Sequence, residues 1–129
     1  MPEKVVPMIH VPDVRTTVDC YVSIGFKASD IGEIEGEAVW ALLSFGSGQV
    51  MLNKGGKPST EHRREVDLYV YVDNIDQFRG TLAGKAEIVE DLHDTFYGMR
   101  EFIIRDCNRF WITFGEPVKK VPDDLLTAR

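Results

Sequence analysis

One pattern occurs twice in this chain, and the repeat limits its possible folds more than any other feature. In each copy a β-rich segment leads to an aspartate or asparagine, then to apolar residues at helical spacing, then to a glycine. The copies are "MIHVPDVRTTVDCYVSIGF", residues 8–26, and "DLYVYVDNIDQFRGTLAGKAE", residues 67–87. Val11 and Val72 are equivalent, an offset of 61 residues (72 − 11). The repeat predicts two similar half-units that pack together to bury their apolar faces.

Each copy carries signals for the start and the end of a helix. Asp13 is a fitting N-cap for the first helix, and Asp73 or Asn74 for the second, because a short polar side chain accepts backbone N–H bonds. Gly25 and Gly84 can end the helices by adopting a left-handed conformation. The apolar stripes that these helices should bury are Val14, Val18, Tyr21 and Val22 in the first, and Ile75, Phe78 and Leu82 in the second.

Strand patterns follow both helices. "EAVWALLSFGSGQVMLN", residues 37–53, reads as two strands joined by a turn at 46–48, and "GMREFIIRDCNRFWITFG", residues 98–115, as two strands turning at 106–109. "KASDIGEIEG" and "EIVED" can each supply one more strand. The order β-α-β-β-β therefore occurs twice.

The predicted fold is α+β, with two tandem βαβββ half-units forming a curved mixed sheet around a cleft and helices covering the other sheet face. The half-units span 5–53 and 65–118 of a single domain. Between them "NKGGKPSTEHRRE" is polar, with two glycines and a proline, and reads as a linker. Residues 119–129 are expected to form a short C-terminal tail.

Composition narrows the classes of partner. The formal net charge is −6, which repels nucleic acid and acidic membranes and tolerates cationic partners. No apolar run approaches the ~18 residues of a membrane span, and the N-terminus does not resemble a secretion signal. Cys20 and Cys107 lie far apart and in no C-x-x-C arrangement. We therefore expect a reduced cytoplasmic protein with two incidental thiols.

Together these motifs resemble a known family. The order strand, "VPDV", helix and "GF", repeated as strand, "VDNI" and helix, is similar to the vicinal-oxygen-chelate superfamily of glyoxalase I, extradiol dioxygenases, fosfomycin-resistance enzymes and bleomycin-resistance proteins. The resemblance covers about residues 5–118. Its most specific part is "FYGMREFIIRDCNRFWITFGEPV", similar to the closing segment "W-G-x-R-E-F…D-P-x-G-x-x-W-x-F" of bleomycin-resistance-like members.

The resemblance also locates the positions where enzymatic members hold a metal. Carried over by the local motifs, these positions fall at Val6, Met51, Asp67 and Thr113. A divalent ion needs three or four converging N, O or S donors. Val6 and Met51 do not serve a hard ion, Thr113 is a poor ligand, and only Asp67 can contribute. We therefore expect no metal and no cofactor.

A small-molecule site is expected in the cleft, because several strand residues share faces that point into it. Asp67 is either a cleft anion that attracts a cation or a strand-end residue that is solvated or paired with Arg63 or Arg64. His10 is either a ligand contact or a partly buried structural histidine, and the aromatic residues either line a pocket or belong to the core. The candidate ligand-binding residues are His10, Met51, Asn53, Asp67, Tyr69, Tyr71, Tyr97, Trp111 and Thr113.

The last turn departs from the family pattern. Arg109 stands where relatives usually have glycine, and Cys107 where they usually have proline. An arginine in a conformation suited to glycine costs on the order of 1 kcal/mol. We therefore expect this turn to have changed shape.

Two functions remain open. In the first, the protein sequesters a small molecule, cationic or aromatic, as bleomycin-resistance proteins do, and carries out no reaction. In the second, it is a metal-dependent lyase, isomerase, dioxygenase or glutathione transferase of the same superfamily, and the missing ligands argue against this. In either case the resemblance implies a homodimer, because relatives bury the edges of their half-units against a partner.

Overall fold

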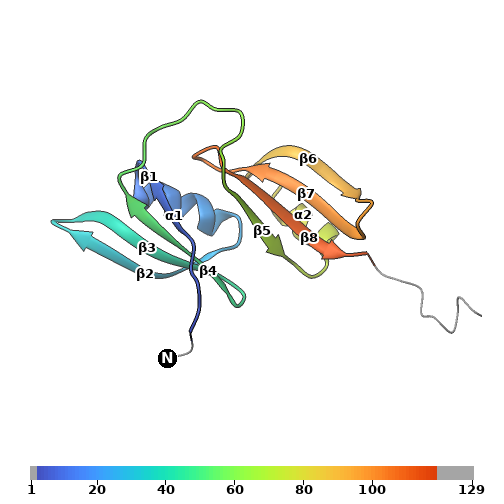
Figure 1. The fold of residues 1–129 in the computed structure, drawn as a ribbon, viewed down its shortest axis with the longest axis horizontal. Coiled ribbons are helices and arrows are strands. Elements are labelled where there is room, and N and C mark those ends of the chain that lie inside the picture. The colour runs from blue at the N-terminus through green and yellow to red at the C-terminus, as the bar shows by residue number, and fades with distance from the viewer. Residues whose placement is uncertain (1–2, 119–129) are drawn as a thin grey trace, which may run out of the picture.

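Each half of the chain forms a four-stranded mixed sheet with one helix, as the computed structural model of residues 3–118 shows (Figure 1). The predicted tail, 119–129, lies outside the described residues. The first half comprises β1 (Met8–Val11), α1 (Val14–Ser23), β2 (Lys27–Ile34), β3 (Glu37–Phe45) and β4 (Gly48–Lys54). The second comprises β5 (Asp67–Tyr71), α2 (Ile75–Thr81), β6 (Glu87–Asp94), β7 (Met99–Arg105) and β8 (Trp111–Pro117). The predicted βαβββ repeat is confirmed.

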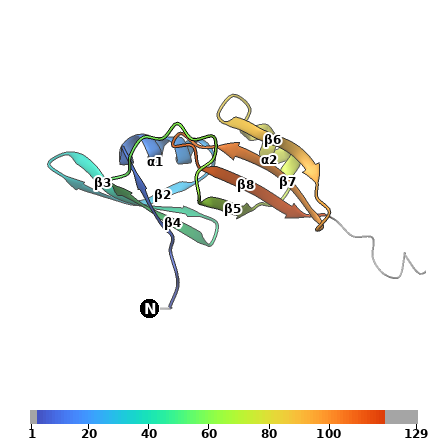
Figure 2. The same ribbon diagram turned by 45° about the horizontal axis from the view of Figure 1, so that its top comes forward.

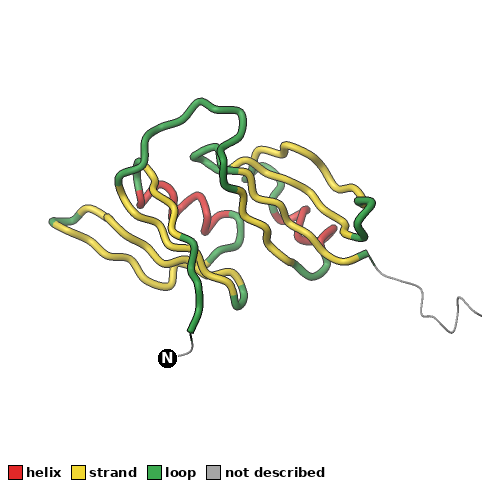
Figure 3. Tube along the Cα trace, viewed as in Figure 1, coloured by secondary structure: helices red, strands yellow, loops and turns green. Residues whose placement is uncertain are grey.

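The two sheets have the same strand order. It is β1-β4-β3-β2 in the first and β5-β8-β7-β6 in the second, with β1 parallel to β4, β5 parallel to β8 and the other pairs antiparallel. Within residues 3–118 the sheets share no strand pairing, so they are two sheets rather than one continuous sheet. They lie side by side along the longest axis, and the linker between β4 and β5 joins them as a loop (Figures 2 and 3).

Helix α1 begins as the sequence predicts. The Asp13 carboxylate accepts the Thr16 backbone N–H at 2.9 Å. Val14, Val18 and Tyr21 of the predicted stripe are buried, whereas Val22 of that stripe is 47% exposed. The helix packs on β2, β3 and β4 of its own sheet.

Helix α2 begins differently. Asn74 is the N-cap residue, but it is left-handed (φ 53°) and its side chain makes no capping hydrogen bond. The backbone N–H groups of Asn74 and Ile75 are instead bound by the two carboxylate oxygens of Glu116 on β8, at 2.7 and 3.2 Å. The second cap is therefore supplied by a residue far away in the sequence.

A continuous core joins the half-units. Phe45 at the end of β3 packs edge-on against Phe78 of α2, with ring centroids 5.9 Å apart. The Tyr21 hydroxyl donates a buried hydrogen bond of 2.6 Å to Asp106, which lies in the turn between β7 and β8. Neither helix in the described part of the chain is long and apolar enough to cross a membrane.

The turn between β7 and β8 corrects one expectation. Arg109 keeps the conformation suited to glycine, with φ 71°. Its backbone N–H donates to the Asp106 carbonyl at 3.1 Å, and its side chain hydrogen-bonds to the Glu61 carbonyl of the linker. These contacts oppose the strain of the left-handed conformation, so the turn has not changed shape to avoid it.

Candidate functional site

A cleft of about 770 Å³ lies between the turn that joins β3 to β4 and the edge strand β5. Asp67, Tyr69 and Tyr71 line it from β5, and Phe45 and Phe78 give it an apolar part. These three residues of β5 share one strand face, as the sequence predicts, because side chains alternate along a strand. The ring centroids of Tyr69 and Tyr71 are 5.0 Å apart. The cleft thus has a wall of two tyrosines beside a carboxylate.

Tyr69 also belongs to a hydrogen-bonded network on the open face of the second sheet. Its hydroxyl donates to one oxygen of Glu101 at 2.7 Å, and the Tyr97 hydroxyl donates to the other at 2.6 Å. Glu101 lies on β7 and is 4% exposed, whereas Tyr69 is 43% and Tyr97 55% exposed. We call these three residues the tyrosine–glutamate network.

Gly115 allows this network to form. On β8 it lies between Tyr71 of β5 and Glu101 of β7 in the strand register. A Cβ atom at residue 115 would stand 2.0 Å from the Tyr69 hydroxyl oxygen. The tyrosine therefore reaches Glu101 by crossing directly over the glycine backbone.

The tyrosine–glutamate network determines whether the hydroxyls of Tyr69 and Tyr97 can donate or accept hydrogen bonds toward a ligand. Burial, and then the hydrogen bond to Glu101, raise the pKa of Tyr69 well above its usual value, and the bond to Glu101 raises the pKa of Tyr97. Both phenols are therefore neutral at physiological pH. Each donates its single proton to Glu101 and presents only acceptor lone pairs to a ligand. No ion pair within residues 3–118 includes Glu101.

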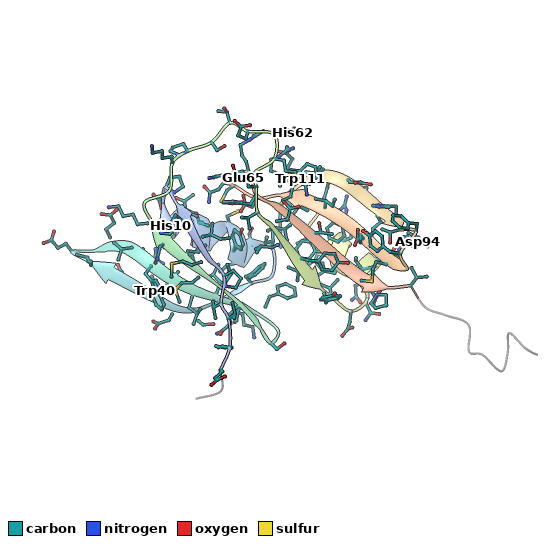
Figure 4. All side chains as sticks on the ribbon, viewed as in Figure 1. His10, Trp40, His62, Glu65, Asp94 and Trp111 are labelled. Atoms are coloured by element: carbon teal, nitrogen blue, oxygen red, sulfur yellow. The ribbon has the colours of Figure 1, made fainter. Side chains whose placement is uncertain are left out.

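Asp67 has a partner within the chain. Arg63 of the linker forms an ion pair with it, and the guanidinium of Arg63 also lies over the Trp111 ring, 4.3 Å from its centroid. The indole N–H of Trp111 donates to the His62 carbonyl at 3.2 Å, and the His62 ring packs edge-on beside it (Figure 4). Of the alternatives for Asp67, the structure therefore shows the pairing with Arg63.

The candidates from the first half-unit form a separate group. His10 lies opposite Asn53 in the pairing of β1 with β4, and Met51 lies opposite Met8. The Asn53 side-chain amide donates to the Met8 sulfur at 2.8 Å. His10 is exposed, and Figure 4 shows it on the same half as Trp40, which pairs with Asn53 from β3.

The nine candidates thus form two groups. His10, Met51 and Asn53 lie together on the first sheet. The other six belong to the second half-unit, where Thr113 pairs with Tyr69, Trp111 pairs with Asp67, and Tyr97 lies in the turn between β6 and β7. Of these, Asp67, Tyr69 and Tyr71 line the cleft. Their role in binding stays a prediction. Sequence reasoning assigned no role to Glu101, although it lies in the quoted motif, and it did not consider Gly115 or Trp40.

The metal positions carried over by resemblance lack a suitable donor set. Val6 precedes β1, Met51 faces Met8 in the strand register, and Thr113 faces Tyr69. Asp67 is engaged by Arg63. Among residues 3–118, no three His, Cys, Asp or Glu side chains are grouped so that they could hold a metal ion. The residues present do not fit the divalent ion that enzymatic relatives use.

Comparisons with known proteins agree with this geometry. Residues 5–114 match the model of the Glyoxalase/Bleomycin resistance protein/Dioxygenase superfamily. An uncharacterised protein of Mycobacterium bovis is 28% identical over 135 residues, covering 95% of this chain and 88% of the relative.

Solved structures share the fold. TioX from Micromonospora sp. ML1 has a TM-score of 0.71 and 24% identity, covering 93% of this chain and 100% of the other. A bleomycin-binding protein complexed with bleomycin has a TM-score of 0.70 and 11% identity, covering 89% of this chain and 98% of the other. At these identities the likeness shows the fold alone.

Proposed function

The chain belongs to the Glyoxalase/Bleomycin resistance protein/Dioxygenase superfamily, and from that premise we propose that it binds and sequesters a small molecule in the cleft beside β5. The proposed ligand is cationic, carries N–H donors and has a flat aromatic part, as a bleomycin-type antibiotic does. Binding requires no metal, and the protein acts as a homodimer in the cytoplasm.

The tyrosine–glutamate network is the observation that carries this proposal. Glu101 is a buried carboxylate whose hydrogen-bond partners are two neutral phenols rather than a cation. Its negative charge is therefore not balanced by an ion pair in the described chain. Because the two hydroxyls have given their protons to Glu101, they accept hydrogen bonds from a ligand. An ammonium group near Tyr69 would balance the negative charge of Glu101 and donate hydrogen bonds to the tyrosine hydroxyls. An amide N–H would donate to the hydroxyls only.

The cleft supports the same class of ligand. Its lining includes the rings of Tyr69 and Tyr71, the carboxylate of Asp73, and that of Asp67, which is paired with Arg63 outside the lining. Stacking on an aromatic face and cation–π attraction each contribute roughly 0.5–2 kcal/mol. The net charge of −6 favours the approach of cations and repels anions.

A panel of ligands tests the proposal. Bleomycin-type and other planar cations, with neutral analogues of similar shape, are titrated against the protein while tryptophan fluorescence and melting temperature are recorded. A ligand that binds only the folded state stabilises it by about 2.7 kcal/mol at a hundredfold excess over its Kd. We expect planar cations to raise the melting temperature and to change the fluorescence. A Trp40→Phe variant assigns that change to Trp111.

Glu101→Gln is the decisive variant. It keeps the shape of the side chain and removes the charge, so it should weaken the cations more than the neutral analogues. If the whole panel leaves both signals of the wild-type protein unchanged, the sequestration proposal fails. Equal weakening of cations and neutral analogues by Glu101→Gln would reject the role of the network.

A further inference from the structure

The two cysteines, 87 positions apart in the sequence (107 − 20), meet at the junction of the half-units. Cys20 lies on α1 and is half-buried, and Cys107 lies in the turn between β7 and β8 and is exposed. Both line one recess of about 260 Å³. Sequence spacing alone suggested two incidental thiols, because it could not show that the turn folds against the helix.

Two hydrogen bonds join the segments that carry the cysteines. The Asn108 side-chain amide donates to the Thr17 hydroxyl at 2.8 Å, and the Tyr21 hydroxyl donates to Asp106 at 2.6 Å. Asp106 and Asn108 flank Cys107 in the turn, while Thr17 and Tyr21 lie on either side of Cys20 on α1. The backbone on both sides of the pair is thereby fixed.

The two thiols have different chemical character. The neighbouring Cys107 side chain lowers the pKa of Cys20, whereas Cys20 and burial raise the pKa of Cys107. Cys20 is therefore the better source of thiolate, and the thiolate is the nucleophilic form of cysteine. Cys107 keeps its proton and stands beside it.

We propose that Cys20 and Cys107 form a redox-sensitive clamp, in which a peroxide converts the two thiols to a disulfide that ties α1 to the β7–β8 turn. The clamp joins the first half-unit to the second at a point other than the linker. Because the cleft lies between the same two half-units, the disulfide limits how far they can separate.

The reaction balances with a peroxide as the only co-reactant. The Cys20 thiolate attacks one peroxide oxygen, the O–O bond breaks, and the sulfur becomes a sulfenic acid while hydroxide leaves and is protonated to water. The Cys107 sulfur then attacks the Cys20 sulfur, the S–O bond breaks, and a second water leaves with the Cys107 proton. Two thiols lose two electrons and two protons, and hydrogen peroxide is reduced to two waters.

The test uses the full chain, reduced, diluted to favour reaction within one molecule and treated with hydrogen peroxide. Thiols are counted under denaturing conditions, the intact mass is measured, and proteolytic fragments are mapped. We expect both thiols to be lost, the mass of the single chain to fall by two hydrogen atoms, and the Cys20 fragment to be joined to the Cys107 fragment. The melting temperature should rise and return to its original value on addition of dithiothreitol, because a cross-link restricts the unfolded chain.

Cys20→Ser and Cys107→Ser are the matched controls, and neither should show a melting temperature that depends on oxidant and reductant. In Cys107→Ser, Cys20 should proceed to sulfinic acid, because no neighbouring thiol resolves the sulfenic acid. The proposal is overturned if both wild-type thiols survive treatment, if the disulfide forms only between chains, or if wild-type Cys20 reaches sulfinic acid as fast as it does in Cys107→Ser.

Discussion

The guanidinium of Arg63 lies over the ring of Trp111, 4.3 Å from its centroid, and the same guanidinium forms an ion pair with Asp67. Sequence analysis left two alternatives for this carboxylate, a cleft anion that attracts a cationic ligand or a strand-end residue that is solvated or paired with Arg63 or Arg64. The structure shows the second alternative, because the linker residue Arg63 places its own guanidinium against both Trp111 and Asp67. A planar cationic ligand that stacks on Trp111 must therefore displace Arg63, whereas the faces of Tyr69 and Tyr71 remain available in the cleft.

Arg63→Gln should increase affinity for planar cations. The substitution removes the cation over Trp111 and releases Asp67, so a ligand gains contacts that Arg63 now occupies. A cation–π contact at an exposed site contributes roughly 0.5–1 kcal/mol, so the Kd should fall about twofold to fivefold. The pair with Asp67 is exposed and contributes little to folding, on the order of 1 kcal/mol or less. Titration followed by Trp111 fluorescence measures the change.

Arg64→Gln is the matched control for this prediction. It removes the same charge from the neighbouring residue, whose guanidinium instead lies over Phe110 and whose hydrogen bond goes to the Asn108 carbonyl. If both variants change affinity equally, the cause is net charge rather than the release of Trp111.

The buried carboxyl of Asp106 should make the free energy of unfolding depend on pH. An Asp106→Asn variant lacks this titrating group and should lack that part of the dependence. Burial raises the pKa of Asp106 above its ordinary value of 3.8. The carboxyl therefore binds a proton more readily in the folded than in the unfolded protein. As pH falls through the folded pKa toward 3.8, the free energy of unfolding should rise relative to that of Asp106→Asn.

Urea denaturation of both proteins across a pH series measures this difference. Exposed acids such as Asp76 and Asp91 have lowered pKa values because arginines hydrogen-bond to them, and they act in the opposite direction. They are present in both proteins, so their effect cancels in the comparison. A wild-type protein that loses stability relative to Asp106→Asn on acidification would contradict the raised pKa.

Local signals were sufficient to predict most of the fold. The Asp13 cap, the alternation in β5 and the turn at 46–48 each depend on neighbouring residues, and all three form as expected. At α2 the predicted N-cap position, Asn74, is correct, but the capping hydrogen bonds go to Glu116 of β8 rather than to the Asn74 side chain. No local pattern shows which distant carboxylate will reach a helix N-terminus.

The candidate site was harder to predict for the same reason. Tyr69 and Tyr71 share a face by strand periodicity, which the sequence displays. The role of Glu101 depends on Tyr69 reaching over Gly115 across two strand pairings. The pairing of β7 with β8 is made through the turn at Arg109, whose left-handed conformation is held by contacts with the linker as well as within the turn.

The protein should form a homodimer. β1 and β5 are each paired on one side only, and Met8 and Tyr71 on these strands are exposed. Such edges commonly pair with or are covered by a partner. Light scattering at micromolar concentration should give twice the chain mass, and Met8→Lys should weaken the dimer about tenfold or more if β1 lies in the interface. A monomer under these conditions contradicts the prediction.

Tyr69→Phe and Tyr71→Phe separate hydrogen bonding from stacking, because each removes one hydroxyl and keeps the ring. Tyr69→Phe leaves one oxygen of the buried Glu101 without its phenol, which should lower the free energy of unfolding by about 1–3 kcal/mol. The Tyr71 side chain is 71% exposed, and its hydroxyl makes no side-chain hydrogen bond within residues 3–118, so Tyr71→Phe should stay within about 0.5 kcal/mol.

Ligand affinity should also change in Tyr69→Phe and not in Tyr71→Phe. Tyr69→Phe removes an acceptor and should weaken cations with N–H donors about tenfold, since a hydrogen bond to a charged group contributes about 1.5 kcal/mol or more. Tyr71→Phe should leave their affinity unchanged, because its ring still stacks. Flat ligands without N–H donors should bind both variants as they bind the wild-type protein. If neither variant loses affinity, the aromatic wall binds by stacking alone and the tyrosine–glutamate network serves only to hold Tyr69 in place; equal losses in both would mean that the Tyr71 hydroxyl contributes as much as that of Tyr69.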